Sequence, residues 1–324
     1  MLSVIEYTKK FNAYLEQQVS CKEPKSLYAP IKYILDLGGK RLRPVLTLMA
    51  AEMFEGTYEE ALDAALAVEI FHNFSLVHDD IMDDAPLRRG KQTVHEKWNI
   101  NTGILSGDTM LIQAYQIFEN YTGDIFIQLA KLFSKTAIAV CEGQQYDVDF
   151  ETRNDVTIPE YLMMIEYKTA VLVGAALKMG AIVAGASQNC KDYIYAFGRD
   201  LGIAFQLQDD YLDAFGDPKT FGKQVGGDII ENKKTFLYLK TIHLSNKEKA
   251  DELIQLFSMS PDNPEQKINI VKEQFIASGA AAATQQEIRK YTNQAFSHLE
   301  ALEIAESSKE RLRSFGKSLM ERTF

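Results

Sequence analysis

The sequence predicts an all-α protein. Apolar residues recur at spacings of three and four along most of the chain, which is the period of helices with one buried face. No segment shows the sustained alternation of apolar and polar residues that is typical of a half-buried strand. The prolines, Pro30 among them, are expected at the starts of elements or in loops. We therefore expect a single domain over residues 1–324, built from ten or more helices whose apolar faces turn inward.

Several helix starts are marked in the sequence. The first segment, "MLSVIEYTKKFNAYL", carries charged residues such as Glu6 among its apolar ones, which predicts an amphipathic helix rather than a signal peptide. Thr157 with Glu160 forms a capping box before the long segment "EYLMMIEYKTAVLVGAALKMGAIV". Ser245 with Glu248 forms another before "KEKADELIQLF".

The stretch "TAVLVGAALKMGAIVAGAS", residues 169–187, imitates a membrane span. Lys178 interrupts it, however, and glycine and alanine make up much of the remainder. Because small residues let helices approach one another closely, we expect a buried helix of a bundle and no transmembrane segment.

Composition and charge narrow the classes of function. With 324 residues, 46% hydrophobic and 25% charged, the chain has the composition of a globular protein. The formal net charge of -10 disfavours a nucleic-acid partner, because the phosphate backbone attracts Lys and Arg. Cys21, Cys141 and Cys190 are far apart and have no CxxC spacing, which indicates free thiols in a reducing compartment. We therefore expect a cytoplasmic location.

Two acidic clusters share one spacing. The segments "SLVHDDIMDD" and "AFQLQDDYLDAF" both contain the pattern D-D-x-x-D after an apolar run. Residues i and i+4 lie on one face of a helix, so Asp79 points the same way as Asp83, and Asp209 the same way as Asp213. Buried carboxylates need a partner, and oxygen ligands without a His or Cys motif favour Mg²⁺ or Mn²⁺ over Zn²⁺. For either cluster alone, the alternative is a solvated acidic helix end paired with surface lysines.

Basic residues accompany these clusters. In "LGGKRLRP", Lys40, Arg41 and Arg43 follow two glycines, which let the backbone approach a phosphate closely. Each of the remaining candidates would alone be an ordinary surface charge: Arg88, Arg89, Lys168, Lys223, Lys233 and Lys234. Together with the acidic clusters they predict two phosphate subsites, one reached through metal ions and one through direct contacts with Arg and Lys.

Six segments, in this order, closely resemble the motifs of the trans-isoprenyl diphosphate synthases: "GGKRLRP", "HDDIMDDAPLRRG", "GQQYD", "EYKT", "FQLQDDYLD" and "GKQVGGDIIENKKT". The resemblance implies an all-α isoprenoid-synthase fold with a deep central cavity, usually in a homodimer. It implies head-to-tail (1′-4) condensation of an allylic diphosphate with isopentenyl diphosphate. It also implies three Mg²⁺ ions, with Mn²⁺ as the alternative metal.

By motif match, the resemblance assigns roles to single residues. The main metal ligands would be Asp79, Asp83 and Asp209, supported directly or through water by Asp80, Asp210 and Asp213. The allylic diphosphate would be held by Arg88, Lys168, Lys223 and Lys233. Isopentenyl diphosphate would be held by Lys40, Arg43, His72 and Arg89. The residues expected to act in catalysis are Asp79, Asp83, Asp209, Arg88, Lys168 and Lys223.

Other matches are weaker in what they assign. Thr169 and Gln206 would be polar contacts in the cavity, and Gln144 matches a Gly-Gln position of the family. Without the resemblance, His72 would be interpreted as a core histidine with satisfied hydrogen bonds. His78 precedes the first cluster directly and is expected at most to support it by a hydrogen bond.

The residues before Asp79 bear on product length. Phe74 lies five positions before Asp79, Ser75 lies four before, and Phe71 lies about one turn further along. An aromatic fifth and a small fourth position resemble a geranylgeranyl-type floor, so we expect a C20 product, then C15, rather than C30 or longer. The alternative is that Phe74 is ordinary helix-packing core.

Two other functions share this fold. A class I terpene cyclase would carry a different second metal motif and would not need "GGKRLRP", the segment for a second diphosphate substrate. A non-catalytic binding or regulatory member should have lost some aspartates or basic residues, and none of those expected is missing.

Overall fold

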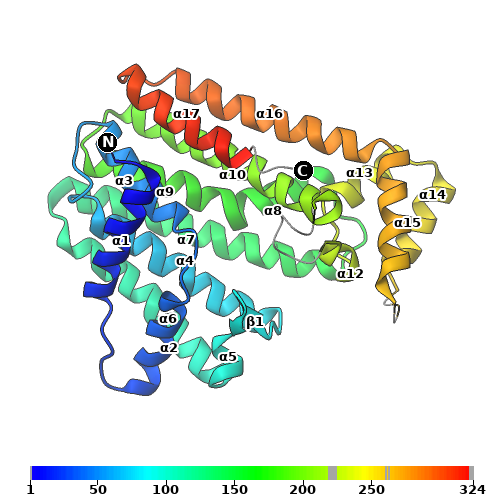
Figure 1. Ribbon diagram of the computed structural model, residues 1–324, viewed down its shortest axis with the longest axis horizontal. Helices are drawn as coiled ribbons and strands as arrows, with labels where there is room; N and C mark the ends of the chain where they lie inside the picture. Colours follow the sequence, from blue (N-terminus) through cyan, green and yellow to red (C-terminus); the bar gives the residue numbers. More distant parts are fainter. Residues whose placement is uncertain (1, 218–224, 260, 262, 321–324) are drawn as a thin grey trace. The chain divides into compact units, whose positions relative to one another are not determined.

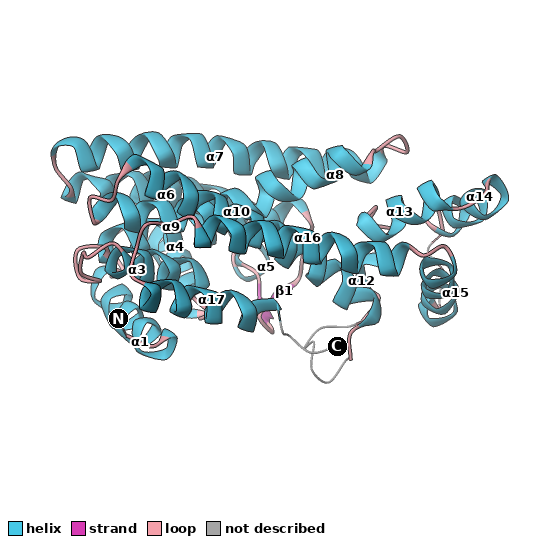
Figure 2. Cartoon of the chain, turned by 90° about the horizontal axis from the view of Figure 1, so that it is seen from above, coloured by secondary structure: helices cyan, strands magenta, loops and turns pink. Residues whose placement is uncertain are grey.

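Helices form nearly all of the regular structure in the computed structural model, which describes residues 2–217, 225–259, 261 and 263–320. Within these residues the strands are β1 (Leu87–Arg88) and β2 (Lys91–Gln92), which pair antiparallel in a short hairpin (Figure 2). The prediction of an all-α fold with ten or more helices is confirmed. No described helix is both long enough and apolar enough to cross a membrane.

The chain divides into two compact units. The first comprises Met1–Thr136, Ala175–Tyr195 and Glu303–Ser308, and the second comprises Ala137–Gly174, Ala196–Leu302 and Lys309–Phe324. The helices that contribute residues to both units are α7 (Gly123–Thr152), α9 (Val171–Val183), α10 (Gln188–Phe215) and α17 (Glu306–Met320). The expectation of a single domain stays a prediction.

The first unit is organised around one long apolar helix, α4 (Leu62–Met82), which packs against α3 and α6 (Figure 1). The helix is largely buried along its first four turns, because its sequence there is mostly apolar. The other elements of this unit are α1 (Val4–Gln18), α2 (Lys25–Asp36), α3 (Leu42–Met53), α5 (Val94–Lys97), α6 (Ile100–Ile117) and the 3-10 turn η1 (Phe118–Asn120).

The second unit has its own core. Buried side chains of α13 such as Phe236 and Leu237 pack with Leu207 and Phe275 in one apolar cluster. The elements that lie wholly in this unit are α8 (Ile158–Ile165), the π-helical turn η2 (Glu166–Ala170), α12 (Gly227–Ile230), α13 (Phe236–Leu244), α14 (Lys247–Leu256), α15 (Pro264–Ala277) and α16 (Ala280–Glu300).

The predicted helix starts have mixed outcomes. The amphipathic first helix and the Thr157–Glu160 capping box are confirmed. The Ser245 box was wrong: Ser245 ends α13, and the side chain of Asn246 caps α14 by accepting from the amide of Lys249 at 3.0 Å. Pro30 also departs from expectation, because it lies inside α2 among buried residues. A proline at that position removes one intrahelical hydrogen bond and crowds the carbonyl of the preceding turn.

A buried charge network fixes the turn before α3. Arg41 has a left-handed backbone, with φ of 49°, and its side chain points into the core of the first unit. Its guanidinium pairs with the carboxylate of Glu69 and donates to the carbonyl oxygen of Leu35 at 2.5 Å. Asn73 completes the network by donating to the same Glu69 carboxylate at 2.9 Å. The turn with Lys40 is thereby anchored to the middle of α4.

Removing one partner of this network should destabilise the protein strongly. Glu69→Ala leaves the Arg41 guanidinium buried without its carboxylate, and we expect a loss of about 3–5 kcal/mol in the free energy of unfolding. Urea unfolding measures this loss. The double variant Arg41→Met with Glu69→Leu should recover most of it, since no buried charge remains. As a control, Asp36→Ala at the exposed Lys32–Asp36 pair should cost under about 1 kcal/mol. Equal effects at both pairs would contradict the analysis.

Candidate active site

The first aspartate cluster lies at the C-terminal end of α4, in the first unit. Asp79 is in the last turn, Asp83 is the C-cap residue, and Asp80 is buried. Burial raises the pKa of Asp80, while the Arg88 guanidinium opposes the rise. Arg88 donates to Asp80 from Nε at 2.7 Å and from Nη2 at 2.6 Å. The hairpin thus folds back on the cluster, and Arg88, predicted to meet the allylic diphosphate, also anchors Asp80.

A basic group lies in the same unit. Arg43 Nη1 is 3.3 Å from His72 Nε2, and Arg89 donates to the carbonyl oxygen of Gly38. A side chain at Gly39, where φ is +127°, would overlap the Arg89 guanidinium, so this close approach requires glycine. Lys40 follows at the exposed end of this turn. The structure therefore brings together the residues predicted to hold isopentenyl diphosphate.

The charge state of His72 follows from its surroundings. Burial and the positive charges of nearby arginines, Arg43 first among them, hold its pKa well below the ordinary value. The ring is therefore neutral at physiological pH. Because a guanidinium can only donate, Nε2 accepts from Arg43 and the proton resides on Nδ1. His72 can offer that N–H to an anion.

The second aspartate cluster lies near the C-terminal end of α10, in the second unit. Asp210 is buried and accepts hydrogen bonds from the Tyr161 hydroxyl and from Gln206 Nε2, the latter at 3.0 Å. Thr169 donates to Gln206 Oε1 at 3.3 Å. Thr169 and Gln206, predicted as cavity contacts, therefore position Asp210 in this structure.

Like charges and burial perturb this cluster. Burial, with the charges of Asp209 and Asp213, raises the pKa of Asp210 to about 7. Burial, with the charges of Asp210 and Asp213, raises the pKa of Asp228 to about 8. The backbone amide of Asp228 donates to Asp213 at 3.0 Å and ties α12 to the cluster. The side chains supply only oxygen donors, which suit a hard divalent cation, and such a cation would relieve the repulsion.

The predicted lysines are placed differently from one another. Lys168 Nζ is 2.5 Å from Asp147 Oδ2, and Lys233 Nζ is 2.9 Å from Glu231 Oε2. Lys234 donates to three backbone carbonyls at the end of α7, so it caps that helix. This supports Lys233 as the phosphate-binding member of the pair. Lys223 lies outside the described residues.

Some residues of the site were not singled out from the sequence. Asp147 is the last residue of "GQQYD" and Asp228 the last of "KQVGGD", so both had a signal in their motifs. Tyr161 had none. Gln144 follows Gly143, whose missing side chain lets α7 lie against the backbone of Lys168.

The predicted chain-length residues belong to an aromatic cluster of the first unit. Phe71 is fully buried, with its ring centroid 5.0 Å from that of Phe133 and 5.5 Å from that of Phe74. Ser75 donates to the carbonyl oxygen of His72 at 2.8 Å. His78 Nε2 is 3.2 Å from the carbonyl oxygen of Ile104 on α6, so its ring contacts a neighbouring helix.

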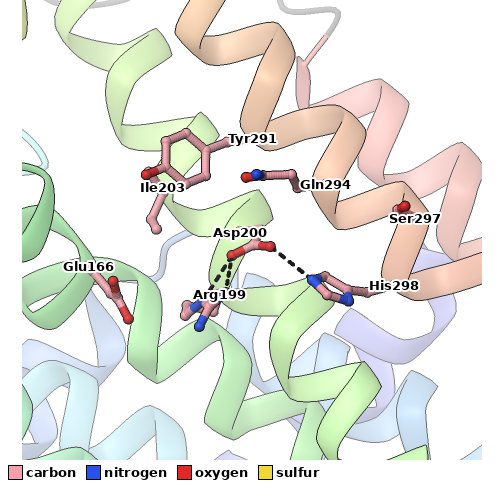
Figure 3. Close-up of a pocket in the computed structure, with 8 residues that line it drawn as sticks. All are labelled: Glu166, Arg199, Asp200, Ile203, Tyr291, Gln294, Ser297 and His298. Atoms are coloured by element: carbon pink, nitrogen blue, oxygen red, sulfur yellow. Dashed lines mark hydrogen bonds and ion pairs between the residues drawn. The ribbon is translucent and has the colours of Figure 1, made fainter. Parts of the chain in front are cut away.

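A separate polar cavity of about 460 Å³ lies in the second unit (Figure 3). Asp200 joins Arg199, at 2.7 Å, to His298, at 3.2 Å. Glu166 enters the cavity from the π turn that also carries Lys168 and Thr169. None of the predicted substrate or metal ligands lines this cavity.

Comparisons with known proteins agree on one family. A family model described as polyprenyl synthetase matches residues 24–274. The geranylgeranyl pyrophosphate synthase of Geoglobus acetivorans is 36% identical over 301 residues, which cover 92% of this chain and 92% of that protein. The geranylfarnesyl diphosphate synthase of Natronomonas pharaonis is 37% identical over 280 residues, covering 81% of this chain and 80% of that protein. A crystal structure of a geranylgeranyl pyrophosphate synthase is 56% identical and covers 100% of both chains with a TM-score of 0.94, which confirms the predicted fold.

The raised pKa of Asp210 predicts how its stability contribution depends on pH. A carboxyl whose pKa is raised in the folded state binds its proton more tightly there than in the unfolded chain. Its stabilising contribution is therefore present below about pH 4 and is lost as pH rises through about 7. In buffer with a metal chelator, Asp210→Asn should therefore gain stability relative to wild type over this range, on the order of a few kcal/mol. Urea unfolding at a series of pH values measures the gain. Exposed Asp149→Asn is the control, and parallel profiles for Asp210→Asn and wild type would refute the prediction.

Proposed function

The chain belongs to the polyprenyl synthetase family, and we propose on this basis that it condenses isopentenyl diphosphate head to tail with an allylic diphosphate. It is a prenyltransferase, and geranylgeranyl diphosphate, C20, is the proposed product, in line with the names of the Geoglobus acetivorans relative and of the solved structure. The observation that carries the proposal is the basic group of Arg43, His72, Arg89 and the Gly38–Gly39 turn. It supplies a place for a second diphosphate besides the aspartate clusters.

The aspartates are proposed to hold divalent cations. The family is metal-dependent, and the oxygen donors of the two clusters favour Mg²⁺, with three ions expected and Mn²⁺ as the alternative. Asp79, Asp83 and Asp209 would be the main ligands, supported by Asp80, Asp210 and Asp213. When bound, such ions neutralise charge that develops on a diphosphate leaving group.

The side chains divide the remaining work. Lys168, Lys233, Arg88 and Lys223 are proposed to hold the allylic diphosphate, and their charges favour cleavage of the allylic C–O bond. Lys40, Arg43, Arg89 and neutral His72 are proposed to hold isopentenyl diphosphate with its double bond near the allylic cation. Apolar walls such as Phe74 would keep water from quenching that cation. The released diphosphate would accept the proton, since no predicted site residue has the position of a dedicated base.

Other functions of the same fold are separated by one assay. A terpene cyclase would consume an allylic diphosphate alone, and a non-catalytic member would consume neither substrate. Turnover that requires both substrates and a divalent cation supports the proposal. Consumption of the allylic diphosphate at the same rate without isopentenyl diphosphate would refute it.

The proposed assembly is a homodimer through α6. Ile104, Leu105 and Ile112 are exposed along this helix, as is Ile127 at the start of α7. Large apolar residues gathered at one surface are typical of subunit interfaces. Leu105→Glu with Ile112→Glu should convert a dimer into a monomer in sedimentation experiments, whereas an unchanged dimer would place the interface elsewhere.

The location proposed for the protein is the cytoplasm. Cys21, Cys141 and Cys190 are free thiols, which supports this location.

The two-subsite arrangement predicts which Michaelis constant each basic residue affects. Arg43→Gln or Arg89→Gln should raise KM for isopentenyl diphosphate about 10-fold or more, because each loses a charge-assisted phosphate contact. Lys168→Ala should instead raise KM for the allylic substrate and lower kcat. Steady-state kinetics with each substrate varied measures the split. Exposed Lys91→Gln, beside Arg89 in the hairpin, is the control, and equal effects on both KM values would contradict two subsites.

Product length is predicted to depend on Phe74. Phe74→Ala should deepen the cavity before the first aspartate motif and lengthen the product by one or more C5 units. Ser75→Phe should shorten the product toward C15 by adding a second aromatic ring one turn before the first aspartate motif. Chromatography of products from labelled isopentenyl diphosphate with C5, C10 and C15 primers measures both effects. Unchanged length in an active Phe74→Ala variant would place the floor elsewhere.

A further inference from the structure

His95, on the short helix α5, is buried without a hydrogen bond. Its side chain is 4% exposed, and neither ring nitrogen has a hydrogen-bond partner among the described residues. Buried polar groups in folded proteins almost always have a partner, and leaving one without costs about 1–3 kcal/mol. None of the motifs assigned to the synthase site includes His95, although the ring lies near enough to Asp80 to act on the pKa of that carboxyl.

Two carboxylates lie next to this imidazole. His95 Nε2 is 3.8 Å from Glu96 Oε1 and 4.0 Å from Asp84 Oδ1. The nitrogen and the two oxygens all lie within 4.8 Å of one another. Asp84 reaches this position because its backbone is left-handed, with φ of 48°, directly after α4 ends. Both carboxylates are open to solvent on their other sides.

These separations are too long for hydrogen bonds and suit ligands that share a metal ion. A direct bond from a protonated imidazole would bring nitrogen and oxygen to about 3 Å. Two ligands about 2.1 Å from an ion at the tetrahedral angle lie about 3.4 Å apart. The exposed side chains of Asp84 and Glu96 can close the remaining distance to the imidazole nitrogen, about 0.6 Å for Asp84 and about 0.4 Å for Glu96, while His95 is fixed by its burial.

We propose that Asp84, His95 and Glu96 form a site for Zn²⁺, with water as the fourth ligand. The imidazole nitrogen distinguishes this site from the aspartate clusters, because Mg²⁺ prefers oxygen ligands whereas Zn²⁺ binds imidazole and carboxylate together. The site is built from side chains of the first unit alone.

The bound ion would act on the hairpin between its ligands. Asp84 precedes β1 and His95 follows β2, so the ion closes a loop that carries Arg88 and Arg89. Restricting that loop lowers the entropy of its open conformations. The site would therefore stiffen the segment that presents both arginines, whatever substrate they hold.

Cobalt is the probe for this site. Co²⁺ replaces Zn²⁺ and absorbs strongly in visible light when four-coordinate, whereas Co²⁺ surrounded by six oxygens absorbs weakly. Titration of the full chain in excess Mg²⁺ should give a strong band at one equivalent of Co²⁺, abolished by Zn²⁺. His95→Gln and Glu96→Gln should each lose the band or weaken binding at least about 10-fold, while exposed His243→Gln should keep it. Glu96→Gln changes an exposed side chain and keeps the test valid if His95→Gln does not fold.

A second measurement locates the effect. Zn²⁺ should slow hydrogen exchange of the backbone amides between residues 85 and 93 in wild type but not in Glu96→Gln. The proposal would be overturned if wild type gave no strong Co²⁺ band. It would also be overturned if the band and the Zn²⁺ effect on hydrogen exchange both persisted in Glu96→Gln. His95 would then be a histidine in long-range contact with two carboxylates.

Discussion

The structure depends on the cost of placing several carboxylates at the ends of buried helices. α4 is apolar along most of its length and α10 buries one apolar face, yet each carries an aspartate cluster near its C-terminal end. In the second cluster the cost is visible as raised pKa values of Asp210 and Asp228. The repulsion among these carboxylates lowers the stability of the folded state. A cation that binds between them removes the repulsion, so the stability that was lost adds to the binding energy of the cation. The same constraint explains why each unit holds basic side chains near its cluster.

The basic turn of the first unit contains two arginines with different roles. A cation paired with a carboxylate is less available to a ligand, and in this turn two arginines divide the structural role and the proposed binding role. Arg41 forms an ion pair with the buried Glu69 and fixes the turn, whereas Arg43 contacts neutral His72 rather than an acid. Within "GGKRLRP", Arg41 thus serves the structure, and Arg43 has the position required by its proposed binding role. A substitution at Arg41 should therefore act on stability and one at Arg43 on the proposed binding of substrate, although both remove one positive charge.

Much of this site was predictable from the sequence because its signals are local. The D-D-x-x-D spacing places Asp79 and Asp83 on one helix face whatever the rest of the fold does. The contact of Gln206 with Asp210 is likewise local, since the two lie four residues apart on α10, whereas the contact from Tyr161 was not predictable, because only tertiary packing brings that segment to the cluster. The same limit explains the error at Ser245, where two neighbouring residues could each cap a helix and the end of α13 decided between them. The burial of His95 likewise depends on neighbours that no local pattern encodes.

The ion pairs of the site would link the proposed binding of metal ions to the proposed binding of a diphosphate. Several cations predicted to meet a diphosphate are held by a carboxylate of their own unit: Arg88 by Asp80, Lys168 by Asp147 and Lys233 by Glu231. A diphosphate must compete with that carboxylate for the cation, and a metal ion competes with the cation for a carboxylate such as Asp80. A metal ion that binds Asp80 would release Arg88 for the diphosphate, and a diphosphate that binds Arg88 would release Asp80 for the metal ion. Such coupling is reciprocal, so metal should tighten diphosphate binding by the same factor by which diphosphate tightens metal binding. The Arg88–Asp80 pair would thus make the two ligands cooperative, besides any direct contact between them.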